Sequence, residues 1–169
     1  MALLTGFFLV SQPNHAAAQG GVAVNHDQME ICCQKISRDI QRIYYLSNRN
    51  GKMRLVVRGI YARGTTLFFS LKLVNRSALD YDINSIRFYV AQKQKGNRIP
   101  RRLEELKPVF VFDSARQVPG HDKLTCVIAI PRHTLARHCR LQIEVMERNG
   151  ARPLLVQAAG FTLQIARSI

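Results

Sequence analysis

The chain has no tryptophan, few acidic residues, and no apolar run of about 18 residues beyond its N-terminal segment. Without such a run, no membrane-spanning helix is expected past that segment. Lysine and arginine number 25 against 11 aspartates and glutamates, so the 169 residues carry a formal net charge of +14. This excess suggests an anionic partner, such as nucleic acid, acidic protein or anionic lipid, or else a solvated basic surface.

Patterns that would indicate catalysis or cofactor binding are missing as well. The sequence contains no Gly-x-Ser-x-Gly, no phosphate loop and no dinucleotide-binding glycine motif. The cysteines lack zinc-site spacing, and His133 and His138 are poorly spaced for holding one metal. The neighbours Glu104 and Glu105 point to opposite faces of a strand, which argues against a catalytic pair. We therefore expect a non-enzymatic protein with no cofactor and no metal.

Two of the four cysteines, Cys126 and Cys139, share the parity of the apolar residues in their strands. The simpler interpretation is two buried free thiols, because cysteine is among the most buried residue types. The alternative is an inter-strand disulfide, which would fit an exported protein.

Residues 1–21 have the composition of a targeting segment. An apolar run from Ala2 to Val10 is followed by Ala16-Ala17-Ala18, as in a signal peptide cleaved after Ala18. The positively charged start of a signal peptide is missing, so a disordered N-terminus is the alternative.

Residues 27–46 are predicted to form one helix. The prediction places Asp27 at the N-cap, with Glu30 closing a capping box, and ends the helix at a turn over Asn48–Gly51. The residues that recur at helical spacing are Met29, Cys32, Cys33, Ile36, Ile40, Ile43 and Tyr44.

From residue 52 to 167 the chain reads as short alternating runs separated by turns. Arg63-Gly64 and Asn149-Gly150 are hairpin signals, residues 132–138 form a connection with one helical turn, and 161–166 form the last strand. We expect a mainly β protein, an antiparallel immunoglobulin-like β-sandwich of about seven strands with the helix at one end or edge. The predicted core comprises Leu55, Val57, Leu67, Phe69, Leu71, Ile86, Phe88, Ile128, Leu141 and Ile143.

The best candidate for partner binding is the segment from Lys93 to Arg102. Five cations in ten residues could hold an acidic partner or a phosphate backbone, or could simply keep the loop solvated. No aromatic residue lies among them, which weakens the case for single-stranded nucleic acid. The five candidate residues are Lys93, Lys95, Arg98, Arg101 and Arg102.

Asp82, Arg87 and Arg152 are predicted to act structurally rather than in binding. An acid and an arginine near the ends of paired strands often tie a loop through a bidentate ion pair.

Several short motifs carry a resemblance to a known family. They are Asn75-x-Ser77, Tyr81-Asp82-Ile83, Ile86-Arg87-Phe88-Tyr89, Arg98, Glu104, Pro108, Val127-x-Ala129-x-Pro131 and Glu147-x-Asn149-Gly150-x-Arg152. Over roughly residues 30–157 the chain resembles the C-terminal, DUF4138-like domain of the TraN family of conjugative transposons. The chain departs from the family in its basic segment and at Ala151, and it is shorter than typical members.

The resemblance implies a structural subunit of a conjugative type IV secretion apparatus, which carries DNA between cells. It also implies a periplasmic protein that reaches the outer membrane through partners. These partners would be other transfer-channel subunits, with a homo-oligomeric ring as one arrangement, and no catalytic residues or cofactors are implied. The alternatives are a basic nucleic-acid-binding module and a truncated, non-functional relative.

Overall fold

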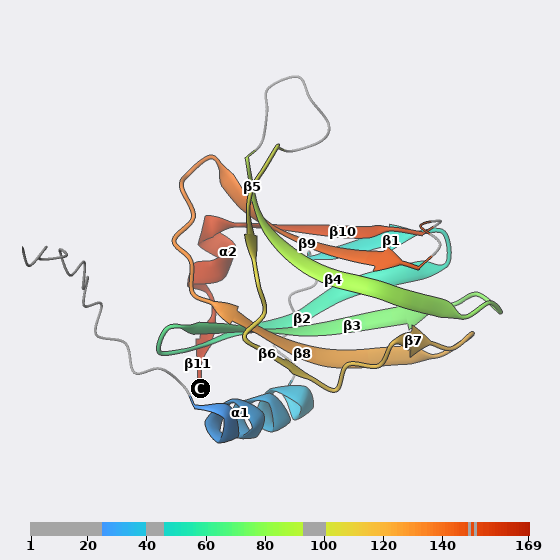
Figure 1. The fold of residues 1–169 in the computed structure, drawn as a ribbon, viewed down its shortest axis with the longest axis horizontal. Coiled ribbons are helices and arrows are strands. Elements are labelled where there is room, and N and C mark those ends of the chain that lie inside the picture. The colour runs from blue at the N-terminus through green and yellow to red at the C-terminus, as the bar shows by residue number, and fades with distance from the viewer. Residues whose placement is uncertain (1–24, 40–45, 93–100, 149, 151) are drawn as a thin grey trace, which may run out of the picture.

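The computed structural model describes residues 25–39, 46–92, 101–148, 150 and 152–169. The signal-like segment and its cleavage site therefore lie outside the described residues. Two sheets stack face to face, and one helix lies below the lower sheet (Figure 1). Within the described residues, no helix combines the length and apolar character needed to cross a bilayer.

The first sheet holds six strands, and one of them, β11, runs parallel to β2. Along its path the order is β1 (Ser47–Asn50), β2 (Met53–Arg63), β3 (Thr66–Asn75), β8 (Lys123–Pro131) and β6 (Phe110–Phe112), with β11 (Arg167–Ser168) off the path. The second sheet is antiparallel and holds five strands. Its order is β10 (Leu154–Ala159), β9 (Cys139–Glu147), β4 (Tyr81–Gln92) and β5 (Arg101–Leu106), with β7 (Gln117–Val118) on β4.

The longer strands account for the predicted immunoglobulin-like sandwich. Strands β2, β3 and β8 form the centre of one sheet, and β10, β9, β4 and β5 form the other. Among these seven strands the chain crosses between the sheets after β3, after β5 and after β8, the Greek-key pattern of such sandwiches. The predicted fold class is confirmed.

Two tight turns explain how β1, β2 and β3 pair in succession. Arg63 pairs with Thr66 across a turn in which Gly64 has φ 54°, as the Arg63-Gly64 signal predicted. Gly51, with φ 57°, begins a second such turn, between Asn50 and Met53. The prediction of a turn over Asn48–Gly51 was wrong at its start, because these residues extend β1 before the glycine.

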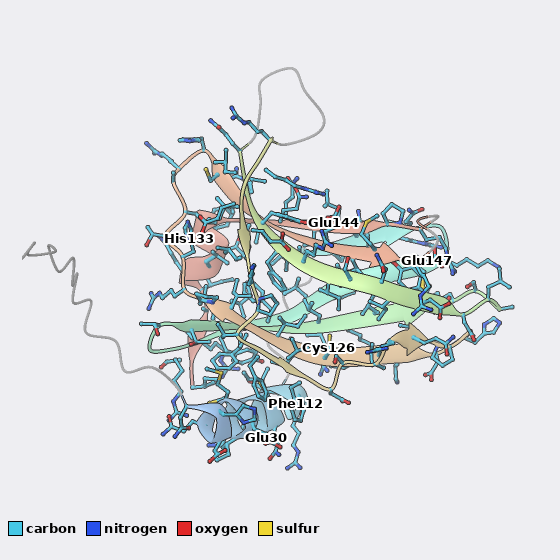
Figure 2. All side chains as sticks on the ribbon, viewed as in Figure 1. Glu30, Phe112, Cys126, His133, Glu144 and Glu147 are labelled. Atoms are coloured by element: carbon cyan, nitrogen blue, oxygen red, sulfur yellow. The ribbon has the colours of Figure 1, made fainter. Side chains whose placement is uncertain are left out.

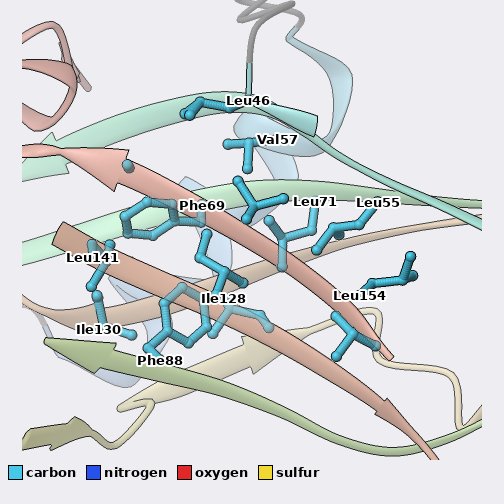
Figure 3. Packing of buried hydrophobic residues seen from close by; sticks show 14 of the residues in the cluster. Leu46, Leu55, Val57, Phe69, Leu71, Phe88, Ile128, Ile130, Leu141 and Leu154 are labelled. Carbon is cyan, nitrogen blue, oxygen red and sulfur yellow. The ribbon is translucent and has the colours of Figure 1, made fainter. Parts of the chain in front are cut away.

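The core lies between the sheets, and nine of the ten predicted core residues are buried. Ile86 is the exception, since it is half-buried and packs against the core from its margin. The rings of Phe69 and Phe88 meet across the two sheets with centroids 5.3 Å apart (Figure 3). Period-two alternation thus predicted the buried face of these strands.

Helix α1 (His26–Arg38) is shorter than predicted and begins at a different cap. The side chain of Asn25, not Asp27, accepts from the N–H of Gln28, so the predicted capping box does not form. Asp39 is extended and ends the helix. Residues 40–45 of the predicted helix lie outside the described residues.

The helix covers the outer face of the first sheet rather than an end or edge. Cys32, Cys33 and Ile36 pack against Phe68 and Val127, which point away from the main core. Both parities of β3 and β8 are apolar in this region, so the sheet needs a second cover. This second apolar face decided the position of the helix.

Three further segments differ from their predictions. Residues 161–166 do not form a strand, because Gly160–Gln164 is the short helix α2, from which Leu163 reaches the core while Phe161 stays exposed. Short apolar runs do not distinguish helix from strand. Residues 132–138 contain no helical turn, and residues 101–106 form strand β5.

All four cysteines are buried and free, which confirms the simpler interpretation of Cys126 and Cys139. Burial raises the pKa of Cys126 to about 12 and, together with nearby Cys32 and Glu30, raises the pKa of Cys33 to about 12. A buried thiol that stays protonated is a poor nucleophile.

A thiol titration tests this arrangement. The native protein, kept without reductant, is expected to react slowly with Ellman's reagent, and the denatured protein is expected to release four equivalents. Two equivalents after denaturation would mean that one disulfide had formed, in contradiction of the free-thiol structure.

Candidate interaction surface

Residues from three separate motifs meet at one end of the sandwich, where Glu147 lies (Figure 2). Arg152 Nε donates to both carboxylate oxygens of Glu147 at 3.0 and 3.1 Å, and its Nη2 donates to the same carboxylate. Nη1 donates to Ser77 Oγ at 3.1 Å, and Nη2 donates to the carbonyl of Asp80 at 2.7 Å. The guanidinium thus joins the β9–β10 hairpin to the crossing between β3 and β4.

Tyr81 and Asn75 complete this cluster. The Tyr81 hydroxyl donates to the carbonyl of Arg152 at 2.9 Å, and burial together with the Glu147 carboxylate raises its pKa to about 12. Asn75 Nδ2 donates to the carbonyls of Leu79 and Val118 at 2.8 and 3.1 Å. We define Asn75, Ser77, Tyr81, Glu147 and Arg152 as the polar corner. Their side chains form hydrogen bonds with one another and with nearby backbone carbonyls of the same chain.

The structural interpretation of Arg152 is therefore confirmed, but its partner is Glu147 rather than Asp82. Asp82 accepts from Gln117 Nε2 at 3.0 Å instead. Arg87 lies half-exposed on the sheet surface and donates to the Tyr89 hydroxyl at 3.4 Å. The five-residue spacing from Glu147 to Arg152 across a hairpin signal could have indicated the pair.

Of the predicted basic segment, Lys93, Lys95 and Arg98 lie outside the described residues. The prediction placed Arg101 and Arg102 in a loop. In the structure they begin strand β5 instead and pair with Gln92 and Ala91. Because Arg-Arg-Leu-Glu-Glu-Leu does not alternate in polarity, the strand left no period-two signal in the sequence.

Arg102 already has partners within the chain. Its Nη2 lies 2.6 Å from Glu144 Oε1, and its guanidinium lies 4.3 Å from the centroid of the Tyr89 ring. The cation therefore covers the aromatic ring on the outer face of the second sheet. Arg101 and Arg102 are both exposed, so both described members of the candidate set reach the surface.

Strand β5 is the edge of the second sheet along its described path. Five of its six residues are exposed, and Leu103 keeps 49% of its surface accessible. The register slips between Val90 and Ala91, which leaves Leu103 as an extra residue on β5. An exposed edge can accept a partner strand, while charges and a bulge discourage indiscriminate pairing. We call Arg101–Leu106 the β5 edge.

The described residues include no group of three or more His, Cys, Asp or Glu side chains placed to hold a metal ion. Their geometry defines an immunoglobulin-like β-sandwich whose second sheet ends in an exposed strand. The motif residues of the polar corner are hydrogen-bonded to one another.

A family model described as a domain of unknown function, DUF4138, matches residues 25–167, and the chain belongs to this family. No curated protein matches the chain. No solved structure matches it either.

Proposed function

We propose that the protein is a non-enzymatic structural subunit of a conjugative type IV secretion apparatus. It acts by protein–protein contact, through the β5 edge and the basic segment that precedes it. The observation that carries the mode of action is the exposed β5 edge, because a free strand is a ready surface for another chain. The link to DNA transfer rests on the motif resemblance to the TraN family.

The polar corner supports a structural role over a chemical one. A catalytic arginine or carboxylate needs hydrogen-bonding capacity directed at a substrate, whereas Arg152 and Glu147 satisfy each other and the surrounding backbone. The side chains that carry the family resemblance thus hold the scaffold together, and the surface they leave free is available for assembly. The partners we propose are other transfer-channel subunits, with a homo-oligomeric ring as one arrangement. The location we propose is the periplasmic side of the outer membrane.

Charge reversal of the basic segment tests this proposal. The variant replaces Lys93, Lys95, Arg98 and Arg101 by glutamate and leaves Arg102 in place, because Arg102 pairs with Glu144. The fold is expected to persist, since exposed substitutions usually cost under about 0.5 kcal/mol each. Transfer frequency and co-purification of the other channel subunits are expected to fall at least about tenfold, which corresponds to about 1.4 kcal/mol.

The matched control reverses four exposed cations elsewhere, so that the net charge changes equally. It replaces Lys35, Arg38, Arg116 and Arg148 by glutamate. Normal transfer and co-purification are expected for this variant. If the first variant also folds and assembles normally, the basic segment is only a solvated connection, and the proposed contact is wrong.

A second candidate function is sequence-independent nucleic-acid binding by the same segment, which the net charge of +14 favours. Phosphate contacts release counterions, so their affinity falls steeply with salt. Two results together would favour this second function. The affinity for nucleic acid would fall steeply with salt in the wild type but not in the charge-reversed variant, and that variant would still co-purify with the other subunits.

A further inference from the structure

The outer face of the first sheet has two halves of opposite character. Helix α1 covers the half around Phe68 and Val127. On the other half, the same parity continues along β3 with Lys72 and along β8 with Lys123. The inward residues of these strands belong to the core, so the alternating residues point away from it.

Strand register places further cations on this second half. Arg49 of β1 is directly opposite Arg54 of β2, Arg54 is opposite Val74 of β3, and Val74 is opposite Lys123 of β8. This row crosses four strands, or about 15 Å at the usual spacing of strands. We call Arg49, Arg54, Lys72, Arg76 and Lys123 the basic face.

The other two cations of the basic face, Lys72 and Arg76, lie on either side of this row. Lys72 is opposite Val56 on one flank and Thr125 on the other. Arg76 follows β3 and lines an open hollow of about 340 Å³, whose other lining residues are Val74, Asn75, His121, Asp122 and Lys123.

The five cations of the basic face form no ion pair with a carboxylate of the described residues. All 11 Asp and Glu residues of the chain lie in this described part. The carboxylate next in sequence is Asp122, which accepts from the backbone N–H of Lys123 at 2.7 Å. Asp122 also lines the hollow beside Arg76 and Lys123, so the basic face keeps a net positive charge with one carboxylate at its margin.

The arrangement is unfavourable for the isolated protein. Like charges directly opposite each other on neighbouring strands destabilise a sheet, and Arg49 and Arg54 are such a pair. Neutral bonds hold their guanidinium groups in place, since Arg49 Nε donates to the carbonyl of Gly51 at 2.8 Å and Arg54 Nη2 donates to Ser47 Oγ at 3.3 Å. An anionic ligand would relieve this repulsion.

The side chains between the cations narrow the class of ligand. Val56, Val74 and Thr125 are small and half-buried, so the basic face offers no large apolar anchor of the kind that protein partners use. The exposed large apolar residues of the described part lie elsewhere, which argues against insertion into a bilayer. The strand register places no Phe, Tyr or Trp opposite these described cations, and the ring that lines the hollow with Arg76 and Lys123 is the imidazole of His121, so support for base stacking by single strands is weak.

We infer that the basic face binds the phosphate backbone of double-stranded nucleic acid, without sequence preference. Duplex DNA carries one negative charge per about 1.7 Å of axis, so a face about 15 Å wide meets several phosphates at once. This binding is separate from the contact proposed for the β5 edge and the basic segment, which belong to the other sheet or its connection.

The test measures binding of the full chain to a fluorescent random-sequence DNA duplex by anisotropy, from about 50 to 200 mM salt. With five phosphate contacts, wild-type affinity is expected to fall by a factor of about 10²–10³ over this range. The variant carries Arg49→Gln, Arg54→Gln, Arg76→Gln, Lys72→Gln and Lys123→Gln. It is expected to bind at least about 100-fold more weakly at the low salt concentration and to lose most of the salt dependence.

The control variant removes the same numbers of arginines and lysines from exposed positions elsewhere. Its changes are Lys35→Gln, Lys107→Gln, Arg116→Gln, Arg132→Gln and Arg137→Gln. It is expected to keep affinity within about threefold of wild type. Circular dichroism checks that both variants fold. If the combined variant does not fold, the five single variants repeat the test, and each is expected to show a salt slope about 0.9 lower than that of the wild type.

Three outcomes would overturn the inference. One is no duplex binding at the low salt concentration, and another is an equal loss in both variants, which would reflect net charge alone. The third is wild-type affinity in the basic-face variant but not in the variant with the reversed basic segment, which would move binding to the segment proposed above for subunit contact. Failure of the subunit contact, by contrast, would appear only in transfer and co-purification, so the two proposals can fail separately.

Discussion

Replacement of Phe69 by alanine is expected to lower the free energy of unfolding by about 3–5 kcal/mol. Phe69 is fully buried, lies opposite Ile60 and Ile128 in its sheet, and contacts Phe88 of the facing sheet. Removing the ring leaves a cavity between the two sheets. Strand pairing within each sheet holds its backbone in place, so the sheets cannot move together to fill the cavity. Urea denaturation followed by circular dichroism measures the change.

Phe161→Ala supplies the matched control, because the same ring is removed from an exposed site. Phe161 keeps 66% of its surface accessible on α2, so its loss is expected to cost under about 1 kcal/mol. Equal losses at the two positions would contradict the assignment of the core to the space between the sheets.

Replacement of Arg152 by alanine is expected to cost about 3 kcal/mol. The change leaves the Glu147 carboxylate, whose side chain is only 10% exposed, without its bidentate partner. It also leaves Ser77 Oγ and the Asp80 carbonyl without the donors they had. An unpaired buried charge is more costly than the loss of the pair as a whole.

Arg167→Ala is the corresponding control, because it breaks an exposed ion pair. Arg167 and Asp39 have side chains 57% and 45% exposed, so their 3.1 Å contact is expected to contribute under about 1 kcal/mol. A double-mutant cycle of Arg152→Ala with Glu147→Ala should show coupling, with the double variant less destabilised than the sum of the single variants. If Arg152→Ala costs no more than Arg167→Ala, the polar corner is not structural and its groups are available to a ligand.

Local chemistry carried much of the fold prediction. Period-two alternation predicted the inward faces of β2, β3, β8 and β9, because side chains alternate between the faces of any strand. Glycine at Gly64 predicted the β2–β3 turn, because a positive φ there is accessible to glycine without strain. These properties depend on a few neighbouring residues, so a single sequence suffices to recognise them.

Segments without a clear period were predicted poorly. The β5 edge has two arginines and two glutamates around Leu103, and its pairing with β4 depends on a partner rather than on its own pattern. The helix at Gly160–Gln164 and the strand at Ser47–Asn50 are too short for periodicity to decide between structures. Tertiary context decided all three.

By itself, the sequence determined that this protein is a basic, mainly β sandwich with a helix near its start, because composition and alternation are local properties. Only the tertiary structure decided which distant residues meet. It placed Ser77 beside Arg152 in the polar corner and put Arg49, Arg54 and Lys123 in one row. Such meetings follow from strand order and register, which the packing of two sheets against each other determines and no single strand encodes.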